Sequence, residues 1–414
     1  MNDVLPVSAQ RREDIIRLLT PVYTKWGFAP IETPAMEKIE RLIGSDGGDN
    51  EKLVFQVLRR GLEKKDYEQA VVEPKKIVDM GLRYDLTVPM ARFYASNHAN
   101  LPTVCKFLQY GSVWRAERPQ KGRFRQFMQW DADIIGATEG LPEIQLLLCS
   151  SEALQALGFE GFTIRFNDRR VLKALVQSVG IEEARQDEAF VVIDKLDKVG
   201  IEGIEKEMSE RGFEQEVIAQ LVEKLSPFLH AKASSIESGL EQLKIDLDTE
   251  TVETMKLVFN EVKNNASDFS IVFDPTLVRG MGYYTGQIFE IAYGGYSFSI
   301  AAGGRYDGMI GRFLGKDTPA CGFSLGFDRI ITILEDKGVW PSVNQRKKMV
   351  LLIQKKDLGE AIKYSRAQRN EACDISIELK AKNIKRQLEE FKSIGFTHFC
   401  LFDPSKTIEV NDLD

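Results

Sequence analysis

The residues best suited to chemistry lie between Val113 and Ile135, where five cationic side chains fall within eleven positions. These cations are Arg115, Arg118, Lys121, Arg123 and Arg125, and the aromatic residues Trp114, Phe124 and Phe127 lie among them. Apolar-rich stretches on both sides predict two strands joined by a basic loop. Because cations that point inward need an anion to offset their desolvation, we expect polyphosphate or nucleic acid there. The alternative is an exposed ribbon with solvated charges, which would not need so many aromatic residues.

A second candidate is Arg279, in the segment LVRGMGYYTGQIFEI at 277–291. The glycines that follow it allow close backbone approach. An arginine beside them is suited to a ligand carboxylate or phosphate, and the alternative is an ion pair with a structural carboxylate such as Asp307. If this segment is extended, Tyr283 and Tyr284 point to opposite faces.

Three shorter patterns add candidates of lower specificity. GGRYDG at 303–308 is consistent with a simple tight connection between a strand and a helix. GFSLGFDRI at 322–330 predicts a strand, a glycine and a helix whose first turn holds Asp328 and Arg329, for which the alternative is an ordinary helix start. In RYDLT at 83–87, Asp85 is suited to an amino group or to a solvated turn, and Thr87 is expected to cap a helix.

Composition narrows the class of protein. The chain has 414 residues, a net charge of −7 and a pI near 5.4, so any nucleic-acid contact must be local. Five isolated cysteines and three histidines predict no zinc site. The start lacks an apolar signal core and no stretch approaches eighteen apolar residues, so we expect a soluble protein of the cytoplasm with no membrane contact.

The chain divides by pattern into β-rich and helical parts. Residues 169–264 are rich in Glu, Lys, Leu and Ile at helical spacing, which predicts a helical segment inserted between β-rich parts. Residues 346–414 alternate strand and helix and carry 14 Lys and Arg against 11 Asp and Glu. They predict a small α/β domain.

Taken together and in this order, the motifs resemble those of the class II aminoacyl-tRNA synthetases, and specifically the histidyl-tRNA synthetase family. ERPQKGRFRQF is similar to the family's motif 2, LVRGMGYYTG and GGRYDG to its two histidine-specific motifs, and GFSLGFDRI to its motif 3. The resemblance covers nearly the whole chain, and four motifs in the right order are specific.

The resemblance implies an α+β fold. Residues 1–168 and 265–340 would form the two parts of a catalytic core around an antiparallel sheet of six or seven strands. Residues 169–264 would be a helical insertion domain, and residues 346–414 a short anticodon-binding-like α/β domain. A homodimer built around the N-terminal helix and the strand near Pro34 is also implied.

The implied activity is a histidine–tRNA ligase, which joins histidine to ATP as histidyl-adenylate and passes it to the 3′ end of tRNA(His). Arg115 matches the arginine on the ATP α-phosphate and Arg279 the histidine-specific arginine, and both would be catalytic. Phe127 matches the adenine-stacking ring, Glu117 the residue at the adenine edge, and Arg329 the arginine near the γ-phosphate. Mg²⁺ would be bound with ATP, not by a protein metal site.

The implied histidine pocket consists of Asp85, Thr87, Gln129, Asp133, Tyr283 and Tyr284. Asp85 and Asp133 would neutralise the substrate ammonium, or Asp133 would meet the imidazole. Gln120 and Arg123 would contact the acceptor end of the tRNA.

Two positions depart from the usual pattern. Gly282 stands where the family has an acidic residue, and Asp85 where many members carry Glu. The C-terminal domain is also shorter than usual. The alternative function is therefore a synthetase-like protein that does not ligate, such as the regulatory subunit of ATP phosphoribosyltransferase. A ligase for another amino acid or carrier is a third hypothesis.

Overall fold

A computed structural model describes residues 3–43, 53–118, 124–279, 283–341, 347–369 and 373–413. The chain from Thr20 to Gly338 forms one compact unit. The chain from Val339 onward forms a second unit together with N-terminal residues up to Leu19, and helix α1 (Pro6–Lys25) contributes to both units. The expected α+β class is confirmed, because the first unit holds a large mixed sheet and the second a small α/β sheet.

The large sheet has the strand order β1-β5-β6-β11-β10-β9-β7-β8 in the described residues. Its strands are β1 (Ala29–Pro30), β5 (Cys105–Trp114), β6 (Gln126–Ile135), β7 (Phe162–Asp168), β8 (Phe269–Phe273), β9 (Gln287–Ala292), β10 (Ala301–Arg305) and β11 (Ala320–Leu325). The central pairs are antiparallel, whereas β1–β5 and β7–β8 at the two edges are parallel. The six strands from β5 to β7 in this order are the expected antiparallel sheet, and the parallel edge strands β1 and β8 are additional to it. A parallel partner for β7 is possible because the long helical segment carries the chain from β7 to β8.

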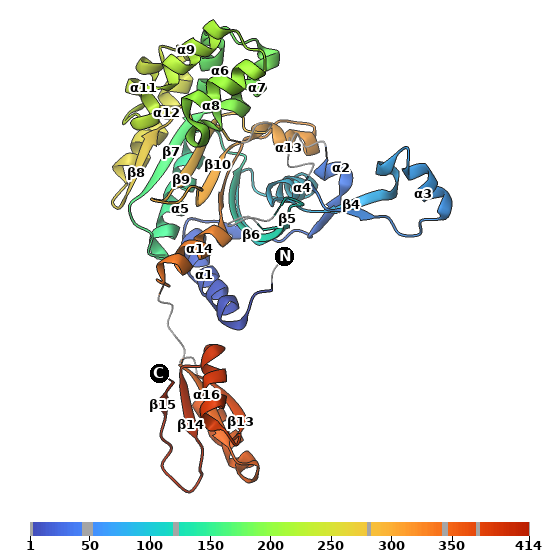
Figure 1. The fold of residues 1–414 in the computed structure, drawn as a ribbon, viewed down its shortest axis with the longest axis vertical. Coiled ribbons are helices and arrows are strands. Elements are labelled where there is room, and N and C mark those ends of the chain that lie inside the picture. The colour runs from blue at the N-terminus through green and yellow to red at the C-terminus, as the bar shows by residue number, and fades with distance from the viewer. Residues whose placement is uncertain are drawn as a thin grey trace. The chain divides into compact units, whose positions relative to one another are not determined.

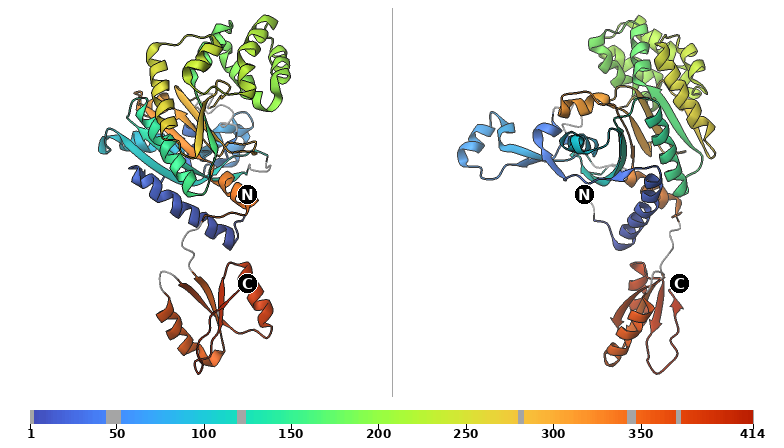
Figure 2. Two further views of the ribbon diagram at one scale, coloured as in Figure 1. Left: turned by 90° about the vertical axis from the view of Figure 1, so that its left-hand side faces the viewer. Right: turned by 180° about the vertical axis from the view of Figure 1, so that it is seen from behind.

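Residues 169–264 are helical from end to end apart from short connections. The elements are α6 (Arg169–Ser178), η4 (Glu183–Arg185), α7 (Gln186–Ile193), α8 (Leu196–Glu210), α9 (Gln215–Leu225), α10 (Pro227–His230), α11 (Ile236–Leu243) and α12 (Thr249–Asn264). Asp168 begins the segment as the N-cap of α6, because its side chain accepts the backbone N–H of Arg170 at 2.8 Å. These helices gather at the β7–β8 edge of the sheet (Figures 1 and 2).

One face of the central strands is covered by apolar packing. Trp130 of β6 is fully buried and stacks on Tyr110 with ring centroids 4.7 Å apart. Tyr23, near the end of α1, packs beside Trp130 and shares a 3.1 Å hydrogen bond with Ser150 of α5 (Leu141–Ala156). Helix α14 (Phe327–Lys337) follows β11 and ends at Gly338, whose φ of 64° favours glycine.

A second apolar cluster lies between the sheet and two further helices, α4 (Thr87–Asn97) and α13 (Asp307–Leu314). It includes Tyr84, Met90, Phe107 and Tyr306, all buried. Tyr283 and Tyr284 pack against it. This cluster supports the aromatic side of the site described below.

A three-stranded sheet with the order β2-β4-β3 forms an arm that extends from the first unit (Figure 1). Its elements are β2 (Met36–Lys38), α2 (Ile39–Leu42), β3 (Gln56–Leu58), α3 (Lys64–Ala70), η2 (Pro74–Ile77) and β4 (Val78–Leu82). A 3-10 turn, η3 (His98–Asn100), follows α4.

The second unit holds the strand order β13-β12-β14-β15 in its described part. Its elements are β12 (Lys347–Ile353), η5 (Lys355–Asp357), α15 (Leu358–Gln368), β13 (Cys373–Leu379), α16 (Ile384–Ser393), β14 (His398–Leu401) and β15 (Asn411–Asp412). β13, β12 and β14 are parallel, and Leu351, Ile375 and Cys400 lie in the core. The predicted strand–helix–strand–helix–strand order is confirmed. None of the described helices combines the length and the apolar character that crossing a membrane requires.

A buried ion pair joins α5 to the end of β10. Arg305 Nε donates to Glu143 Oε1 at 2.7 Å, and the two side chains are 3% and 0% exposed. The other oxygen of Glu143 accepts the backbone N–H of Gly140 at 2.7 Å, at the start of α5. We expect Glu143→Ala to lower the free energy of unfolding by about 3–5 kcal/mol, because it leaves Arg305 buried without this partner. Chemical denaturation measures this loss.

The matched control is Glu210→Ala, which removes a carboxylate from a solvated pair with Lys206 at 3.9 Å. Its effect should stay within about 0.5 kcal/mol. Equal losses in the two variants would contradict a structural role for the buried pair.

Candidate active site

A cavity of about 530 Å³ opens on the face of the central sheet opposite Trp130. Its walls come from β6, β10 and β11, from the start of α4 and from the segments around Arg115 and Arg279. It is lined by every described residue that the resemblance assigns to ATP or histidine: Asp85, Thr87, Arg115, Glu117, Phe127, Gln129, Asp133, Arg279, Tyr283, Tyr284 and Arg329. Gln120, Arg123 and Gly282 lie outside the described residues.

Strand β6 supplies one row of this wall by simple alternation. Phe127, Gln129, Asp131 and Asp133 line the cavity, whereas Trp130 and Ala132 are packed away from it, and Met128 also lines the cavity. Sequence reasoning missed Asp131, although the same period of two that places Gln129 and Asp133 on one face also includes it. Asp131 lies opposite Ser324 of β11, whose hydroxyl donates to its carboxylate at 2.5 Å.

Three buried carboxyl groups converge in the cavity: Asp85, Asp131 and Asp133. Burial raises the pKa of Asp85 to about 6, although the hydrogen bond from the Val88 N–H and the charge of Arg115 both act to lower it. Burial also raises the pKa of Asp133 to about 7, with Asp85 adding to the rise. For Asp131 the pKa is raised by burial and by the neighbouring Asp133. Such a group of carboxyls favours a ligand that brings positive charge.

Asp133 is held by two features of its surroundings. The Tyr306 hydroxyl donates a short hydrogen bond to Asp133 Oδ1. On β11, Gly322 lies directly opposite Asp133, and a Cβ at this glycine would be 2.0 Å from the same oxygen. The carboxylate therefore occupies the space that any larger residue at position 322 would need.

Asp85, not Thr87, caps helix α4. The carboxylate of Asp85 accepts the backbone N–H of Val88 at 3.2 Å, while Thr87 is already the first residue of the helix. The residue at the N-cap position is Leu86, whose side chain makes no hydrogen bond, so the expected cap at Thr87 was wrong, but Asp85 and Thr87 both still line the cavity. The tyrosine pair also differs from expectation. The rings of Tyr283 and Tyr284 contact each other with centroids 4.4 Å apart, because this segment is a turn and not a strand.

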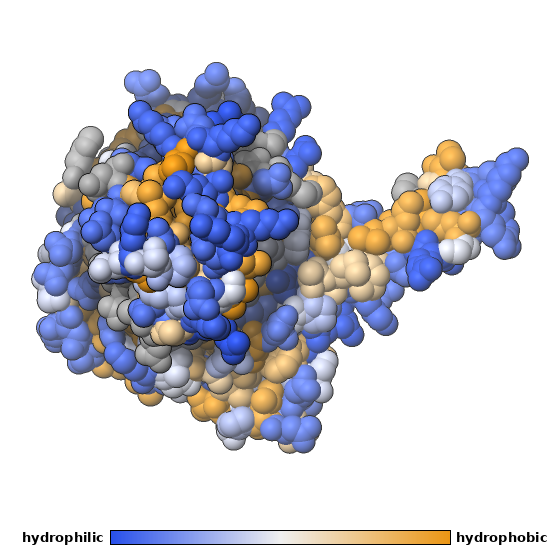
Figure 3. All heavy atoms as spheres, turned by 90° about the horizontal axis from the view of Figure 1, so that it is seen from below, coloured by the Kyte–Doolittle hydropathy of each residue, from blue (hydrophilic) through white to orange (hydrophobic). Residues whose placement is uncertain are grey.

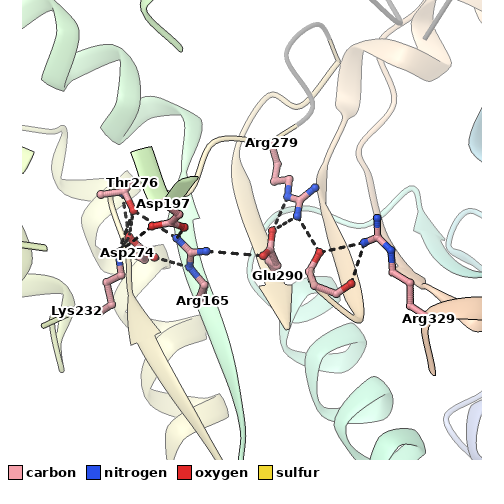
Figure 4. Close-up of polar contacts among 9 residues, drawn as sticks. Arg165, Asp197, Lys232, Asp274, Thr276, Arg279, Glu290 and Arg329 are labelled. Carbon is pink, nitrogen blue, oxygen red and sulfur yellow. Dashed lines mark hydrogen bonds and ion pairs between the residues drawn. The ribbon is translucent and has the colours of Figure 1, made fainter. Parts of the chain in front are cut away.

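The cavity also holds a basic group. Arg279 forms a short ion pair with Glu290 and donates to Ser299 Oγ at 2.8 Å, and Arg329 Nη1 donates to the backbone carbonyl of Ser299 at 2.8 Å. Both guanidinium groups are therefore anchored on Ser299 and line the same cavity (Figure 4). The suggested partner Asp307 pairs instead with Arg305 at 2.9 Å. Glu290 and Ser299 were not singled out from sequence.

Arg115 and Phe127 meet where the two strands of the basic hairpin end. The Arg115 guanidinium lies 5.0 Å from the centroid of the Phe127 ring, and its Nε donates to the carbonyl of Tyr84 at 3.0 Å. Arg115 is close enough to Asp85 and Asp131 to act on the pKa of each, so it lies between the acidic and the basic group. The predicted pair of strands around a basic loop is confirmed.

Helix α14 contributes a further contact that sequence reasoning left open. The carboxylate of Asp328 accepts the backbone N–H of Met128 at 2.6 Å. This bond ties the first turn of α14 to β6, so Asp328 does more than favour a helix start. It fixes the position of Arg329, the next residue, relative to the strand that carries Phe127 and Gln129.

The arrangement suits a ligand with anionic and cationic parts. Arginines on rigid anchors are matched to phosphate oxygens, and the carboxyls and tyrosine hydroxyls are matched to an ammonium or an imidazole. Among the described residues no cluster of His, Cys, Asp or Glu has the makings of a metal site.

Replacing Asp133 by Asn should make the empty protein more stable at high pH. The pKa of Asp133 is near 7 in the folded state and 3.8 ordinarily, so the folded state keeps a proton that the unfolded chain has lost. This contribution to stability is present at low pH and disappears as the pH rises through 7. Asn cannot titrate and still accepts the Tyr306 hydrogen bond. We expect a gain on the order of 2 kcal/mol at pH 8 and little or none at pH 4, measured by urea unfolding.

The control is Asp246→Asn at an exposed carboxyl, for which the difference from the parent protein should be the same at both pH values. A difference for Asp133→Asn that did not change with pH would contradict the assignment of this buried carboxyl.

Comparison with known proteins identifies the family. The sequence profile described as histidyl-tRNA synthetase matches residues 1–330. The histidine–tRNA ligase of Leifsonia xyli subsp. xyli is 40% identical over 420 residues, covering 100% of this chain and 96% of that protein. A probable histidine–tRNA ligase of Tropheryma whipplei is 36% identical over 98% of this chain and 95% of its own length.

Two solved structures share the fold. The histidyl-tRNA synthetase of Nostoc sp. PCC 7120 superposes with a TM-score of 0.77 at 23% identity, over 100% of this chain and 93% of that one. The second structure, from Bacillus halodurans C, is described as an ATP phosphoribosyltransferase regulatory subunit/histidyl-tRNA synthetase. It superposes with a TM-score of 0.76 at 21% identity, over 94% of each chain. The fold, the profile match and the full-length relatives agree. The chain therefore belongs to the histidyl-tRNA synthetase family.

Proposed function

We infer that this chain is a histidine–tRNA ligase, which activates histidine with ATP and transfers the histidyl group to tRNA(His). The observation that carries the inference is the pairing, in one cavity, of three arginines with three buried carboxyls. A substrate pair consisting of a polyphosphate and a cationic amino acid needs both groups at once. Full-length relatives at 40% and 36% identity bear the same activity in their names.

We propose Arg115 and Arg279 as the catalytic residues at the ATP α-phosphate. Charge builds on that phosphate as pyrophosphate leaves, and guanidinium groups held in place stabilise it without reorganising. The Tyr84 carbonyl holds the Nε edge of Arg115, and Glu290 with Ser299 holds the Nε and Nη2 edge of Arg279. The attacking histidine carboxylate is already a nucleophile, so orientation replaces a general base.

For the rest of ATP we propose Phe127 as the stacking ring, Glu117 at the adenine edge and Arg329 near the γ-phosphate. All three line the cavity. Mg²⁺ would arrive bound to the nucleotide phosphates, where it offsets their charge.

For histidine we propose a pocket of Asp85, Thr87, Gln129, Asp133, Tyr283 and Tyr284. Asp85 and Asp133 would neutralise the ammonium, or Asp133 would meet the imidazole. Gln129 is oriented by its 3.1 Å bond to Ser324, which also holds Asp131. We add Asp131 to the pocket because it lines the cavity between Gln129 and Asp133.

The tRNA would meet two regions. We propose the loop with Gln120 and Arg123 as the contact for the acceptor end and residues 346–414, with their excess of positive charge, as an anticodon-binding-like domain. Residues 169–264 would be the helical insertion domain, and residues 1–168 and 265–340 the catalytic core. ATP, histidine and tRNA meet in the cytoplasm, which we propose as the location.

The competing function is a synthetase-like regulatory protein without ligase activity. The two solved structures have almost equal TM-scores, so the fold is compatible with either function. The presence of Arg115, Arg279 and Arg329 around one cavity favours the ligase, because a protein that forms no adenylate has no use for this arrangement.

The deciding experiment is histidine-dependent exchange of labelled pyrophosphate into ATP. We expect exchange with histidine, and we expect Arg279→Ala to lower its rate by roughly 10²-fold or more, the usual cost of one lost transition-state donor. Exchange with a different amino acid would overturn the choice of substrate, and no exchange with any amino acid would favour the regulatory protein. A near-normal rate in Arg279→Ala would contradict the role of that residue.

We further propose a homodimer whose interface includes the arm. Apolar side chains are exposed along it, with Val71 at 85%, Val72 at 83% and Tyr67 at 51%, and Figure 3 shows apolar surface along the arm. β2 begins two residues after Pro34, so the arm continues from the segment that the resemblance assigns to the dimer.

If this surface contacts a second copy, Val72→Asp should shift the protein toward the monomer, because burying an unpaired carboxylate is costly. Light scattering after size-exclusion chromatography measures the change. The control is Leu257→Asp on α12, an exposed apolar side chain away from the arm that should leave the dimer intact. A monomeric parent protein, or equal behaviour of the two variants, would contradict the proposal.

A further inference from the structure

Glu290 is a buried carboxylate shared by two arginines. Its residue is 6% exposed, and its Oε2 accepts from Nε and Nη2 of Arg279. Its other oxygen lies 3.8 Å from Arg165 Nη1. A carboxylate buried to this degree is retained only when cations compensate for its lost hydration. Glu290 therefore depends on Arg165 as well as on Arg279.

The pairing of Arg165 with Glu290 follows from strand register. β7 and β9 are antiparallel, and Arg165 lies directly opposite Glu290 in their ladder. Cross-strand neighbours face the same side of a sheet, so the two side chains meet without a long reach. Arg165 also forms two further ion pairs. Its Nε donates to Asp274 Oδ2 at 2.5 Å, and its Nη2 pairs with Asp197 Oδ2 at 2.7 Å.

Asp197 brings the helical segment into this network. It lies in the first turn of α8, and its side chain is 48% exposed. Lys232, also in that segment, reaches Asp274 at 3.1 Å from the other side. Figure 4 shows the resulting series of contacts, from Asp197 through Arg165 and Glu290 to Arg279.

We propose that Asp197, Arg165 and Glu290 form a positioning relay, through which helix α8 sets the direction of the Arg279 guanidinium in the cavity. The relay goes beyond the residues that touch substrate, and its activity readout rests on the proposed ligase function. Because the relay ends at the exposed residue Asp197, a movement of α8 would change the direction of the Arg279 guanidinium.

The bonding of Arg279 explains how such a relay acts on chemistry. Glu290 and Ser299 hold the Nε and Nη2 atoms, and Nη1 has no hydrogen-bond partner in the described part of the chain. The guanidinium thus has one fixed edge and one edge left for an anion in the cavity that it lines. A donor that is displaced by about 1 Å loses up to 10²-fold in rate, so a small turn of Glu290 is sufficient.

A purely structural ion-pair network is the alternative, in which Ser299 alone directs Arg279. The two possibilities differ in kinetics. A relay acts on the transition state through Arg279, so it changes kcat of histidine-dependent pyrophosphate exchange more than KM for ATP. It also gives no further loss once Arg279 is absent. A structural network affects folding and leaves the rate of folded protein unchanged.

The test compares Glu290→Gln and Asp197→Asn with Glu207→Gln, a control in the same helical segment that lies beyond the break in α8 at Gly200. Glu207 pairs with Lys195 at 2.7 Å and takes no part in the relay. We expect kcat of exchange to fall roughly tenfold in Glu290→Gln and about threefold in Asp197→Asn. KM for ATP should change by less than about twofold in both, and Glu207→Gln should match the parent protein.

A double-mutant cycle completes the test. Glu290→Gln combined with Arg279→Ala should be no slower than Arg279→Ala alone. Independent losses in the double variant, or relay variants that behave like Glu207→Gln, would overturn the relay. If Glu290→Gln does not fold, Asp197→Asn at the exposed end gives the answer.

Failure of the proposed function is recognised separately, because the parent protein would then show no histidine-dependent exchange. In that case the relay is judged on stability. The shift in urea midpoint of the Asp197→Asn, Glu290→Gln double variant should differ from the sum of the single shifts, since both residues contact Arg165. Additive shifts would overturn it.

Discussion

The register of β6 against β11 is the constraint on which the site depends. β6 is buried on both sides, with Trp130, Ala132 and Ile134 in the apolar core and Gln129, Asp131 and Asp133 in the cavity. A shift of one residue would exchange the two sets, placing carboxyls in the core and an indole in the cavity. Such a shift is excluded by the cost of burying unpaired charge, so the core and the site fix each other.

The cavity is costly to the empty protein. Desolvation raises the pKa values of Asp85, Asp131 and Asp133, and neighbouring carboxyls add to the rise for Asp131 and Asp133. The arginines nearby are held by groups other than these three. The carboxyl groups and the guanidinium groups are thus kept partly apart, although direct ion pairs between them would make the empty protein more stable. A substrate that carries both signs relieves this arrangement, which is the expected compromise between stability and function in a binding site.

Much of the site was predictable because its residues sit in patterns with a period or a spacing. The basic hairpin, the arginines next to glycines and the helical segment between β7 and β8 all follow from local sequence. The errors concern contacts between distant segments. Glu290 was missed as the partner of Arg279, because Arg279 lies outside the strands and no period or spacing in the sequence relates the two residues. Thr87 was assigned a cap that Asp85 provides, since two capping residues two positions apart differ only in where the helix begins. Asp131 could have been found from alternation alone. The parallel pairing of the edge strands β1 and β8 depends on the course of the whole chain, which no local pattern gives.

The close approach of Gly322 to Asp133 has a consequence for redesign of this fold. The oxygen that would meet the substrate fills the space in which a side chain at 322 would begin. The two strands therefore share one volume, and a side chain at position 322 requires that Asp133 move or be replaced. Anyone who wishes to give such an enzyme a different amino acid must treat the two positions as a single variable, and libraries that vary them one at a time will sample almost none of the useful shapes.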